Sequence, residues 1–206
     1  MNKRNISIQA GILAIFSLIS VSAYAGQISS SLTATSNYIW RGVSQTNDEA
    51  AIQGGVDYTI NKHFYAGAWT SNVANDTELD IYAGYTDKFG EFDFDAGIIT
   101  YQYLGNSGLD DFTEAYAGAV YKSYSAKISI DVNESDIYLE GAADFELPDK
   151  YLLTVHLGIY SYDRAGFTDY NDYSATISKG ELSFMISDTD LSNDDINVNV
   201  SWNKSF

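Results

Sequence analysis

The chain has 206 residues, with 28 acidic against 11 basic side chains, a formal net charge of −17 and no Cys. So strong a negative charge argues against nucleic acid or another polyanion as a partner. The lack of Cys excludes disulfides and an N-terminal lipid-modified Cys. Aromatic residues make up 15% of the chain, which together with its β-branched residues argues against a disordered acidic protein.

Residues 1–25 read as a signal peptide. Lys3 and Arg4 precede an apolar stretch over residues 6–21, and Ala23-Tyr24-Ala25 is an A-x-A cleavage signal. We expect cleavage before Gly26, export from the cytoplasm and one domain over residues 26–206; a retained anchor helix is the alternative. No later apolar run is long enough for a membrane helix, so a membrane crossing by the mature chain would be made of strands.

The mature sequence alternates between apolar and polar residues. Residues 196–203 alternate at every position, and residues 125–132 and 137–147 do the same, which predicts strands with one apolar face. Short Tyr-Ala-Gly segments recur at residues 65–67, 82–84 and 116–118, which is consistent with a repeated hairpin or with composition alone. We predict twelve strands, over residues 27–38, 50–60, 64–73, 78–87, 92–104, 112–122, 125–132, 136–147, 150–162, 170–179, 181–188 and 195–206.

The connections and the end of the chain favour an outer-membrane barrel. Short turns alternate with longer acidic connections such as residues 41–49, 74–77 and 105–111, as tight periplasmic turns alternate with outer loops. The chain ends in Phe206 after Trp202 and Val200, although Lys204 departs from the apolar pattern of a C-terminal assembly signal.

We therefore expect an all-β fold, a transmembrane antiparallel up-and-down β-barrel of about twelve strands with both termini periplasmic. Its expected partners are outer-membrane lipid and lipopolysaccharide, and the barrel assembly machinery during biogenesis. The structural rival is a soluble β-sandwich or lipocalin-like barrel, in which the apolar face would point inward.

One stretch carries a family resemblance. Residues 36–45 read Ser-Asn-Tyr-Ile-Trp-Arg-Gly-Val-Ser-Gln, which resembles the S-x-Y-x-x-R-G-x-S-Q signature of the TorF-like family of porins. The resemblance continues through residues 51–58, 64–73 and 78–85. It implies an outer-membrane channel of the Gram-negative cell envelope, with no established substrate and no catalytic residue, cofactor or metal to carry over.

The alternation also predicts which charged residues line the lumen. A Lys or Arg facing lipid near the midplane costs about 2–4 kcal/mol and an acid somewhat less, so charged residues of the strands belong inside. A ring of carboxylates between low-dielectric walls attracts cations. The expected pore-lining acids are Asp57, Glu78, Asp80, Asp93, Asp95, Glu114, Asp131, Glu140, Asp144, Glu146 and Asp172.

These acids predict an ion-transporting porin, a passive channel for small cations or small polar solutes. The alternative is a lumen filled by Tyr and carboxylate side chains, hence a non-conducting structural or surface-binding barrel. Arg41 is expected at the mouth: if Tyr38 and Trp40 belong to the outer aromatic girdle, Arg41 points inward. There it forms a constriction with a lumenal carboxylate, or it only anchors the first loop.

Catalysis and metal binding have weaker support. His156 is the only His expected in the lumen, and beside Asp144 or Asp172 it would have to serve a barrel hydrolase without any nucleophile spacing to support that role. No Cys or His cluster indicates a metal or cofactor. The acidic residues 188–195 either hold Ca²⁺ loosely or are solvated.

Overall fold

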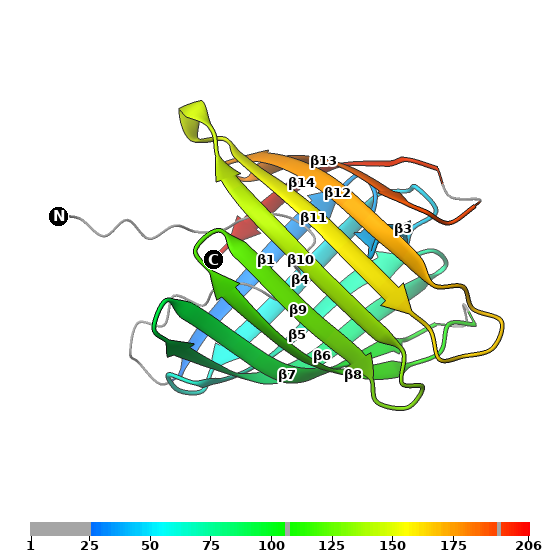
Figure 1. The fold of residues 1–206 in the computed structure, drawn as a ribbon, viewed down its shortest axis with the longest axis horizontal. Helices are drawn as coiled ribbons and strands as arrows, with labels where there is room; N and C mark the ends of the chain where they lie inside the picture. Colours follow the sequence, from blue (N-terminus) through cyan, green and yellow to red (C-terminus); the bar gives the residue numbers. More distant parts are fainter. Residues whose placement is uncertain (1–25, 106–107, 193–194) are drawn as a thin grey trace.

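The computed structural model describes residues 26–105, 108–192 and 195–206, so the predicted signal peptide lies outside the described residues. Twelve strands close into one antiparallel barrel in which neighbours in sequence pair and β14 returns to β1 (Figure 1). The predicted twelve-stranded up-and-down barrel is confirmed. The strands are β1 (Gln27–Thr35), β4 (Ala51–Thr59), β5 (Phe64–Val73), β6 (Asp76–Phe89), β7 (Phe92–Tyr103), β8 (Phe112–Tyr121), β9 (Tyr124–Asp131), β10 (Ile137–Glu146), β11 (Leu152–Ser161), β12 (Tyr170–Lys179), β13 (Leu182–Thr189) and β14 (Asn197–Ser205).

Three short elements lie outside the barrel sheet. Strands β2 (Ile39–Trp40) and β3 (Val43–Ser44) form a separate hairpin between β1 and β4, and η1 (Pro148–Lys150) is a 3₁₀ turn between β10 and β11. Most predicted strand ends lie within two or three residues of the observed ones. Strand β1, however, ends at Thr35, and the connection between β5 and β6 is a tight turn at residues 74–75 instead of a longer loop. Among the described residues, no helix has the length and apolar character needed to span a membrane.

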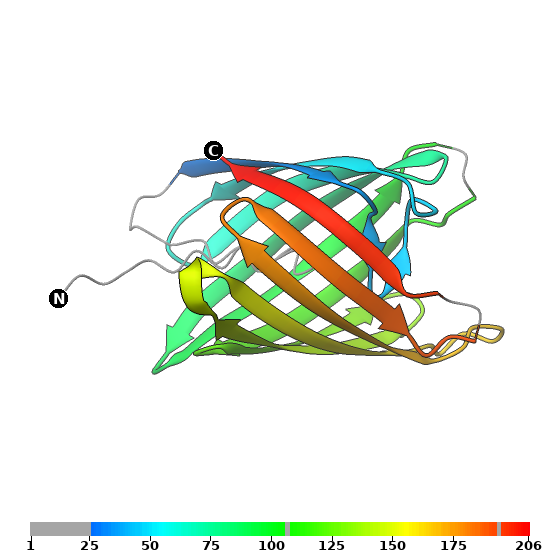
Figure 2. The same ribbon diagram turned by 90° about the horizontal axis from the view of Figure 1, so that it is seen from above.

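The barrel is apolar outside and polar inside. On β11, for example, Leu157 is 62% exposed on the outer face while its neighbour His156 is buried on the inner face. The same alternation runs along β6, where Ile81 is exposed and Asp80 is buried. A soluble barrel has the opposite arrangement, so the lipocalin-like rival is excluded. Strand β1 begins and strand β14 ends at the same end of the barrel (Figures 1 and 2).

The Tyr-Ala-Gly segments have a packing role on the inner face. Tyr65 of β5 pairs with Gly84 of β6, and Tyr82 of β6 pairs with Gly67 of β5. A Cβ atom at Gly84 would lie 2.4 Å from the Tyr65 ring, and one at Gly67 would lie 2.5 Å from the Tyr82 ring. The hydroxyl end of each ring therefore lies over a glycine of the neighbouring strand, which explains why tyrosine and glycine recur together at this spacing.

Lys204 is accommodated at the barrel rim. Its ammonium group pairs with Glu181, which also accepts a hydrogen bond of 2.9 Å from Trp202 Nε1. The charge of Lys204, which departs from the apolar C-terminal pattern, is thus paired locally with Glu181. Because the pair lies at the end of β14, the charge stays close to water.

The outward face predicts a depth-dependent response to charge. Leu157→Arg, near the middle of β11, should lower the free energy of unfolding in lipid by about 2–4 kcal/mol. Leu182→Arg, at the first residue of β13, should lower it by about 0–1 kcal/mol because the guanidinium can reach the interface. Leu182 is 59% exposed, so the two positions differ in depth and hardly in exposure. Urea unfolding in liposomes measures both, and equal losses would contradict a lipid-facing outer surface.

Candidate functional site

The connection between β1 and β4 folds into the barrel instead of extending outward. Its hairpin pairs Ile39 with Ser44 and Trp40 with Val43, and Arg41 and Gly42 form the tip. Both tip residues have positive φ, 50° and 84°, as a tight two-residue hairpin turn requires. The prediction that Tyr38 and Trp40 belong to an outer girdle is therefore wrong, since Trp40 packs against Tyr101 and Tyr160 inside.

The tip of the hairpin is fixed by strands β12 to β14. The hydroxyl of Tyr170 donates to the Arg41 carbonyl at 3.1 Å, and Asn197 Nδ2 donates to the Gly42 carbonyl at 3.1 Å. A Cβ atom at position 42 would lie 2.5 Å from Thr189 and 2.7 Å from Asp172. Only glycine fits a left-handed turn so close to β12 and β13, which explains the Arg-Gly pair of the motif.

Arg41 is buried in a box of one carboxylate and three aromatic rings. Its two terminal nitrogens donate to the two oxygens of Glu114 at 2.8 and 2.7 Å. The guanidinium carbon lies 4.1 Å from the centres of the Trp40 and Tyr138 rings and 4.9 Å from that of Tyr160. Burial opposes the charge, but Glu114 outweighs it and raises the pKa of Arg41 above its usual value.

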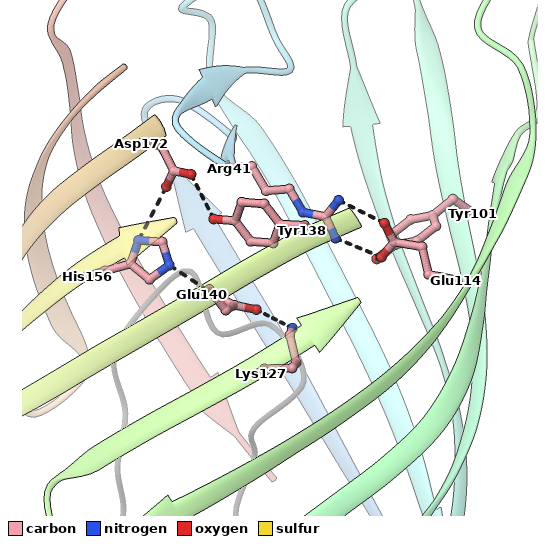
Figure 3. A network of polar contacts seen from close by, with 8 residues as sticks. All are labelled: Arg41, Tyr101, Glu114, Lys127, Tyr138, Glu140, His156 and Asp172. Carbon is pink, nitrogen blue, oxygen red and sulfur yellow. Dashed lines mark hydrogen bonds and ion pairs between the residues drawn. The ribbon is translucent and has the colours of Figure 1, made fainter. Parts of the chain in front are cut away.

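A second polar network lies beside this box (Figure 3). Lys127 Nζ lies 2.6 Å from one oxygen of Glu140, and His156 Nε2 lies 3.2 Å from the other. His156 Nδ1 lies 3.3 Å from Asp172, whose second oxygen accepts a hydrogen bond of 2.8 Å from Tyr138. Because the Tyr138 ring also stacks on Arg41, the two networks share one side chain. His156 thus lies between two carboxylates, an arrangement that neutralises charge more readily than it activates a nucleophile.

The structure places the predicted pore-lining acids on the inner face, at different depths. Glu78, Asp80, Asp95, Glu114, Asp131, Glu140 and Asp172 are buried, Asp57, Asp93 and Asp144 are half-buried, and Glu146 is exposed at the end of β10. Of these, Glu114, Glu140 and Asp172 meet in the networks around Arg41.

Several of the other acids have local partners. Tyr82 donates to Asp57 at 2.5 Å, Tyr65 to Asp95 at 2.8 Å and Thr154 to Asp144 at 2.6 Å. Lys88 pairs with Asp93 at the rim, and Asp131 accepts hydrogen bonds from the backbone of its own loop.

The sequence reasoning left Tyr138 and Tyr160 out of the site. The signal for Tyr138 was present, because alternation puts it on the same face of β10 as Glu140. What alternation could not indicate is that an arginine from the first connection reaches these rings. The predicted Ca²⁺ loop is not tested fully, because Asp194 lies outside the described residues. Among those described, no group of three His, Cys, Asp or Glu side chains is arranged to hold a metal.

The Arg41–Glu114 pair generates a stability prediction. Arg41→Ala leaves the Glu114 carboxylate buried without its partner, which should cost about 3–5 kcal/mol of unfolding free energy. Arg41→Ala combined with Glu114→Gln should recover part of that loss, because the residual side chain is neutral. The matched control is Lys88→Ala, which breaks the exposed pair with Asp93 and should cost about 1 kcal/mol or less. Equal effects of Arg41→Ala and Lys88→Ala on urea unfolding would contradict a strongly coupled buried pair.

Comparison with solved structures shows a similarity to outer-membrane porins. The structure titled "KdgM porin" matches with a TM-score of 0.60 and 11% identity over 86% of this chain and 98% of that chain. A second, "KdgM porin in complex with disordered oligogalacturonate", has a TM-score of 0.56 and 10% identity over 87% and 97%. Pseudomonas aeruginosa OccK5 (OpdH) has a TM-score of 0.44 and 14% identity over 84% and 63%. The KdgM matches show a shared barrel fold.

Comparison of the sequence with known protein families identifies one family. No match was found among curated proteins. A family model described as "Bacterial protein of unknown function (Gcw_chp)" matches residues 21–198, which includes the motif at residues 36–45 and all but the end of the barrel. This description does not carry the TorF-like name, so that name stays a resemblance. The chain belongs to the Gcw_chp family of bacterial proteins.

Proposed function

We propose that this protein is a narrow outer-membrane channel through which small cations or small polar solutes diffuse passively. The observation that carries the proposal is the division of side chains between the two faces of the barrel: apolar groups outside, carboxylates inside. An apolar outer band suits lipid, and a polar interior suits a water-filled path. The shared fold with KdgM supports the same reading.

The location follows from this proposal. We infer that the chain is exported with its signal peptide, folded by the barrel assembly machinery and embedded in outer-membrane lipid and lipopolysaccharide. The end of the barrel with the short turns and both chain ends would face the periplasm, and the end with the longer loops would face outward.

The charge preference rests on the inner wall. The inner wall holds more acids than bases, because Arg41 and Lys127 are balanced by Glu114 and Glu140, while Glu78, Asp80 and Asp95 form no ion pair. Such an interior concentrates cations and repels anions. One KdgM structure is a complex with oligogalacturonate, a chain of carboxylate-bearing sugars. The acidic wall would repel a ligand of that charge, so we propose the opposite preference for this barrel.

The hairpin with Arg41 provides the constriction. It crosses the interior from the β1 side and ends against Glu114 of β8 on one side and Tyr170 of β12 on another. Solutes would pass beside it, which limits the channel to small molecules unless the hairpin moves.

One observation favours a second candidate, a non-conducting structural or surface-binding barrel. Two aromatic clusters occupy the interior, one around Tyr82, Tyr101 and Tyr116 and the other around Tyr138, Tyr160 and Tyr170. Trp40 packs against both of them. If side chains fill the whole cross-section at this level, no solute passes.

Planar bilayers separate the two candidates and test the role of Arg41. We expect the wild-type protein to give small conductance steps and, under a salt gradient, a reversal potential of the sign set by cations. Arg41→Ala should raise the conductance, because it removes the side chain that bridges the lumen and also one positive charge. Lys88→Ala, which removes a rim charge, serves as the control and should leave step size nearly unchanged.

Each outcome has a clear meaning. No conductance steps from either protein, with the barrel shown to be folded by its mobility shift on unboiled gels, would favour the non-conducting barrel. A reversal potential of the anion-selective sign would contradict the acidic lumen as the selective element. Unchanged steps in Arg41→Ala would assign Arg41 to loop anchoring alone.

A further inference from the structure

His156 lies inside the barrel with a carboxylate on each side of its ring. The side chain is buried on the inner face of β11. Its Nε2 lies 3.2 Å from Glu140 of β10, and its Nδ1 lies 3.3 Å from Asp172 of β12, the latter an ion-pair contact without hydrogen-bond geometry. Lys127 of β9 lies behind Glu140, and Tyr138 of β10 lies behind Asp172. The imidazole thus bridges β10 and β12, the two strands that flank its own.

This placement determines the charge of the ring. A neutral imidazole has one N–H donor and one nitrogen lone pair, whereas an imidazolium has two donors. With a carboxylate oxygen within 3.3 Å of each nitrogen, a neutral ring would direct its lone pair at a negatively charged oxygen. Only the imidazolium presents a proton to both Glu140 and Asp172. The geometry therefore favours a positively charged His156 at neutral pH.

A charged His156 also balances the network as a whole. The network then contains three carboxylates and three cations: Glu114, Glu140 and Asp172 with Arg41, Lys127 and His156 (Figure 3). With a neutral ring, Asp172 would lose its positive partner, because its other oxygen accepts from the neutral hydroxyl of Tyr138 at 2.8 Å. A buried carboxylate without a positive partner is costly. The charge balance and the direction of the ring nitrogens therefore agree on the imidazolium.

A short chain of contacts connects this charge to the constriction. One oxygen of Asp172 faces His156, and the other accepts the Tyr138 hydroxyl. The Tyr138 ring lies against Arg41, with the guanidinium carbon 4.1 Å from the ring centre. Asp172 also lies next to the hairpin tip, since a Cβ atom at Gly42 would lie 2.7 Å from the Asp172 Cβ. The position of the Asp172 side chain thus affects both the ring that covers Arg41 and the turn that carries it.

The contact between Asp172 and Tyr138 has little freedom. The two side chains meet over Gly158 of β11, which pairs with Asp172 in the sheet. A Cβ atom at Gly158 would collide with the Tyr138 hydroxyl and with an oxygen of Asp172. Close packing against the backbone of β11 restricts both groups, and a tightly packed interior transmits displacements. A change in what holds Asp172 is therefore passed on to the Tyr138 ring.

We propose that His156 is a positioning residue for the constriction: as an imidazolium it holds the Asp172 carboxylate, which in turn holds Tyr138 against the Arg41 guanidinium. Without that charge, the carboxylates of Glu140 and Asp172 repel each other and Tyr138 loses its fixed acceptor. The inference deepens the proposed channel function, on which its role in transport rests, by naming what keeps the constriction in place. The positioning itself is a property of the folded barrel and can be measured without conduction.

NMR on isotope-labelled mature protein in detergent micelles at neutral pH tests both parts of the proposal. The ¹⁵N shifts of His156 should show two protonated ring nitrogens, and the His156→Gln variant distinguishes its signals from those of His63. The second readout is rotation of the Arg41 guanidinium about its Nε–Cζ bond. His156→Gln should make this rotation at least about tenfold faster, because the surroundings of Arg41 lose support comparable with one hydrogen bond to a charged group.

Two further variants separate the charge of His156 from its packing. His156→Gln combined with Asp172→Asn removes one cation and one carboxylate together and keeps an acceptor for Tyr138, so the Arg41 rotation should return close to the wild-type rate. Thr154→Val is the matched control. Thr154 is buried on the same face of β11 but donates to Asp144, outside the chain of contacts to Arg41, so its loss should leave the rotation unchanged. The mobility shift on unboiled gels shows that each variant folds.

The opposite results overturn the proposal. A deprotonated ring nitrogen of His156 at neutral pH would refute the imidazolium, and unchanged Arg41 rotation in His156→Gln would refute the positioning. Equal acceleration in His156→Gln and in the double variant would leave His156 a packing role alone, and equal acceleration by Thr154→Val would reveal general loosening. The bilayer result is separate. The expected NMR results without conductance would support the positioning and reject the channel, whereas conductance with unchanged rotation would retain the channel and reject the positioning.

Discussion

The outer face of this barrel constrains almost everything inside it. Every long strand carries apolar side chains outward, so the charged side chains of the strand interiors have to find their partners inside the barrel. The constraint explains why the inner wall consists of linked polar groups: Arg41 with Glu114, Lys127 with Glu140, His156 with Asp172. It also explains the tyrosines, which donate a hydroxyl to a carboxylate and fill the volume above a facing glycine with their rings. The same residues therefore balance the charges of the interior and fill its volume.

Within that interior, the Arg41 hairpin connects regions that are far apart in sequence. Arg41 meets Glu114 of β8 through its side chain and Tyr170 of β12 through its carbonyl. A buried bidentate pair gains strength from the low dielectric, but it is costly to break one side at a time. Movement of the hairpin would therefore have to exchange the guanidinium of Arg41 for another cation, or for water, at Glu114.

The barrel itself could be predicted from sequence because its signal is local. A period of two along residues 125–132 or 196–203 is visible within eight residues, and the resulting faces are the observed ones. The site was harder to predict because its contacts are long-range. Arg41 and Glu114 are 73 residues apart, and the sequence around Arg41 does not indicate which strand its side chain will reach. Alternation predicts that Tyr38 and Trp40 belong to the outer girdle at the end of the first strand, but the Arg-Gly turn that follows folds the segment inward.

Sequence alternation predicts the face on which each acid lies, but it does not predict whether its carboxylate has a partner. Alternation gives the direction of a side chain and not its partner, so Asp95, which accepts from Tyr65, and Asp80, whose carboxyl bonds to that of Glu78, look alike in sequence. The difference arises from the neighbouring strands, where tyrosine hydroxyls reach one carboxylate and not the other.

The distribution of charge around the lumen gives the interior two unlike sides. Strands β6 to β8 contribute Glu78, Asp80, Asp95 and Glu114, whereas β12 to β14 contribute, apart from Asp172 beside His156, buried hydroxyl and amide groups such as Thr176, Ser187 and Asn199. Hydroxyl and amide groups can hydrogen-bond a solute or water without holding a fixed charge. In the proposed channel, a cation would be drawn toward the wall of β6 to β8 and would meet neutral polar groups on the other. A solute with a positive end and a neutral polar end would fit this asymmetry better than a symmetrical ion, because each end would face the wall that complements it.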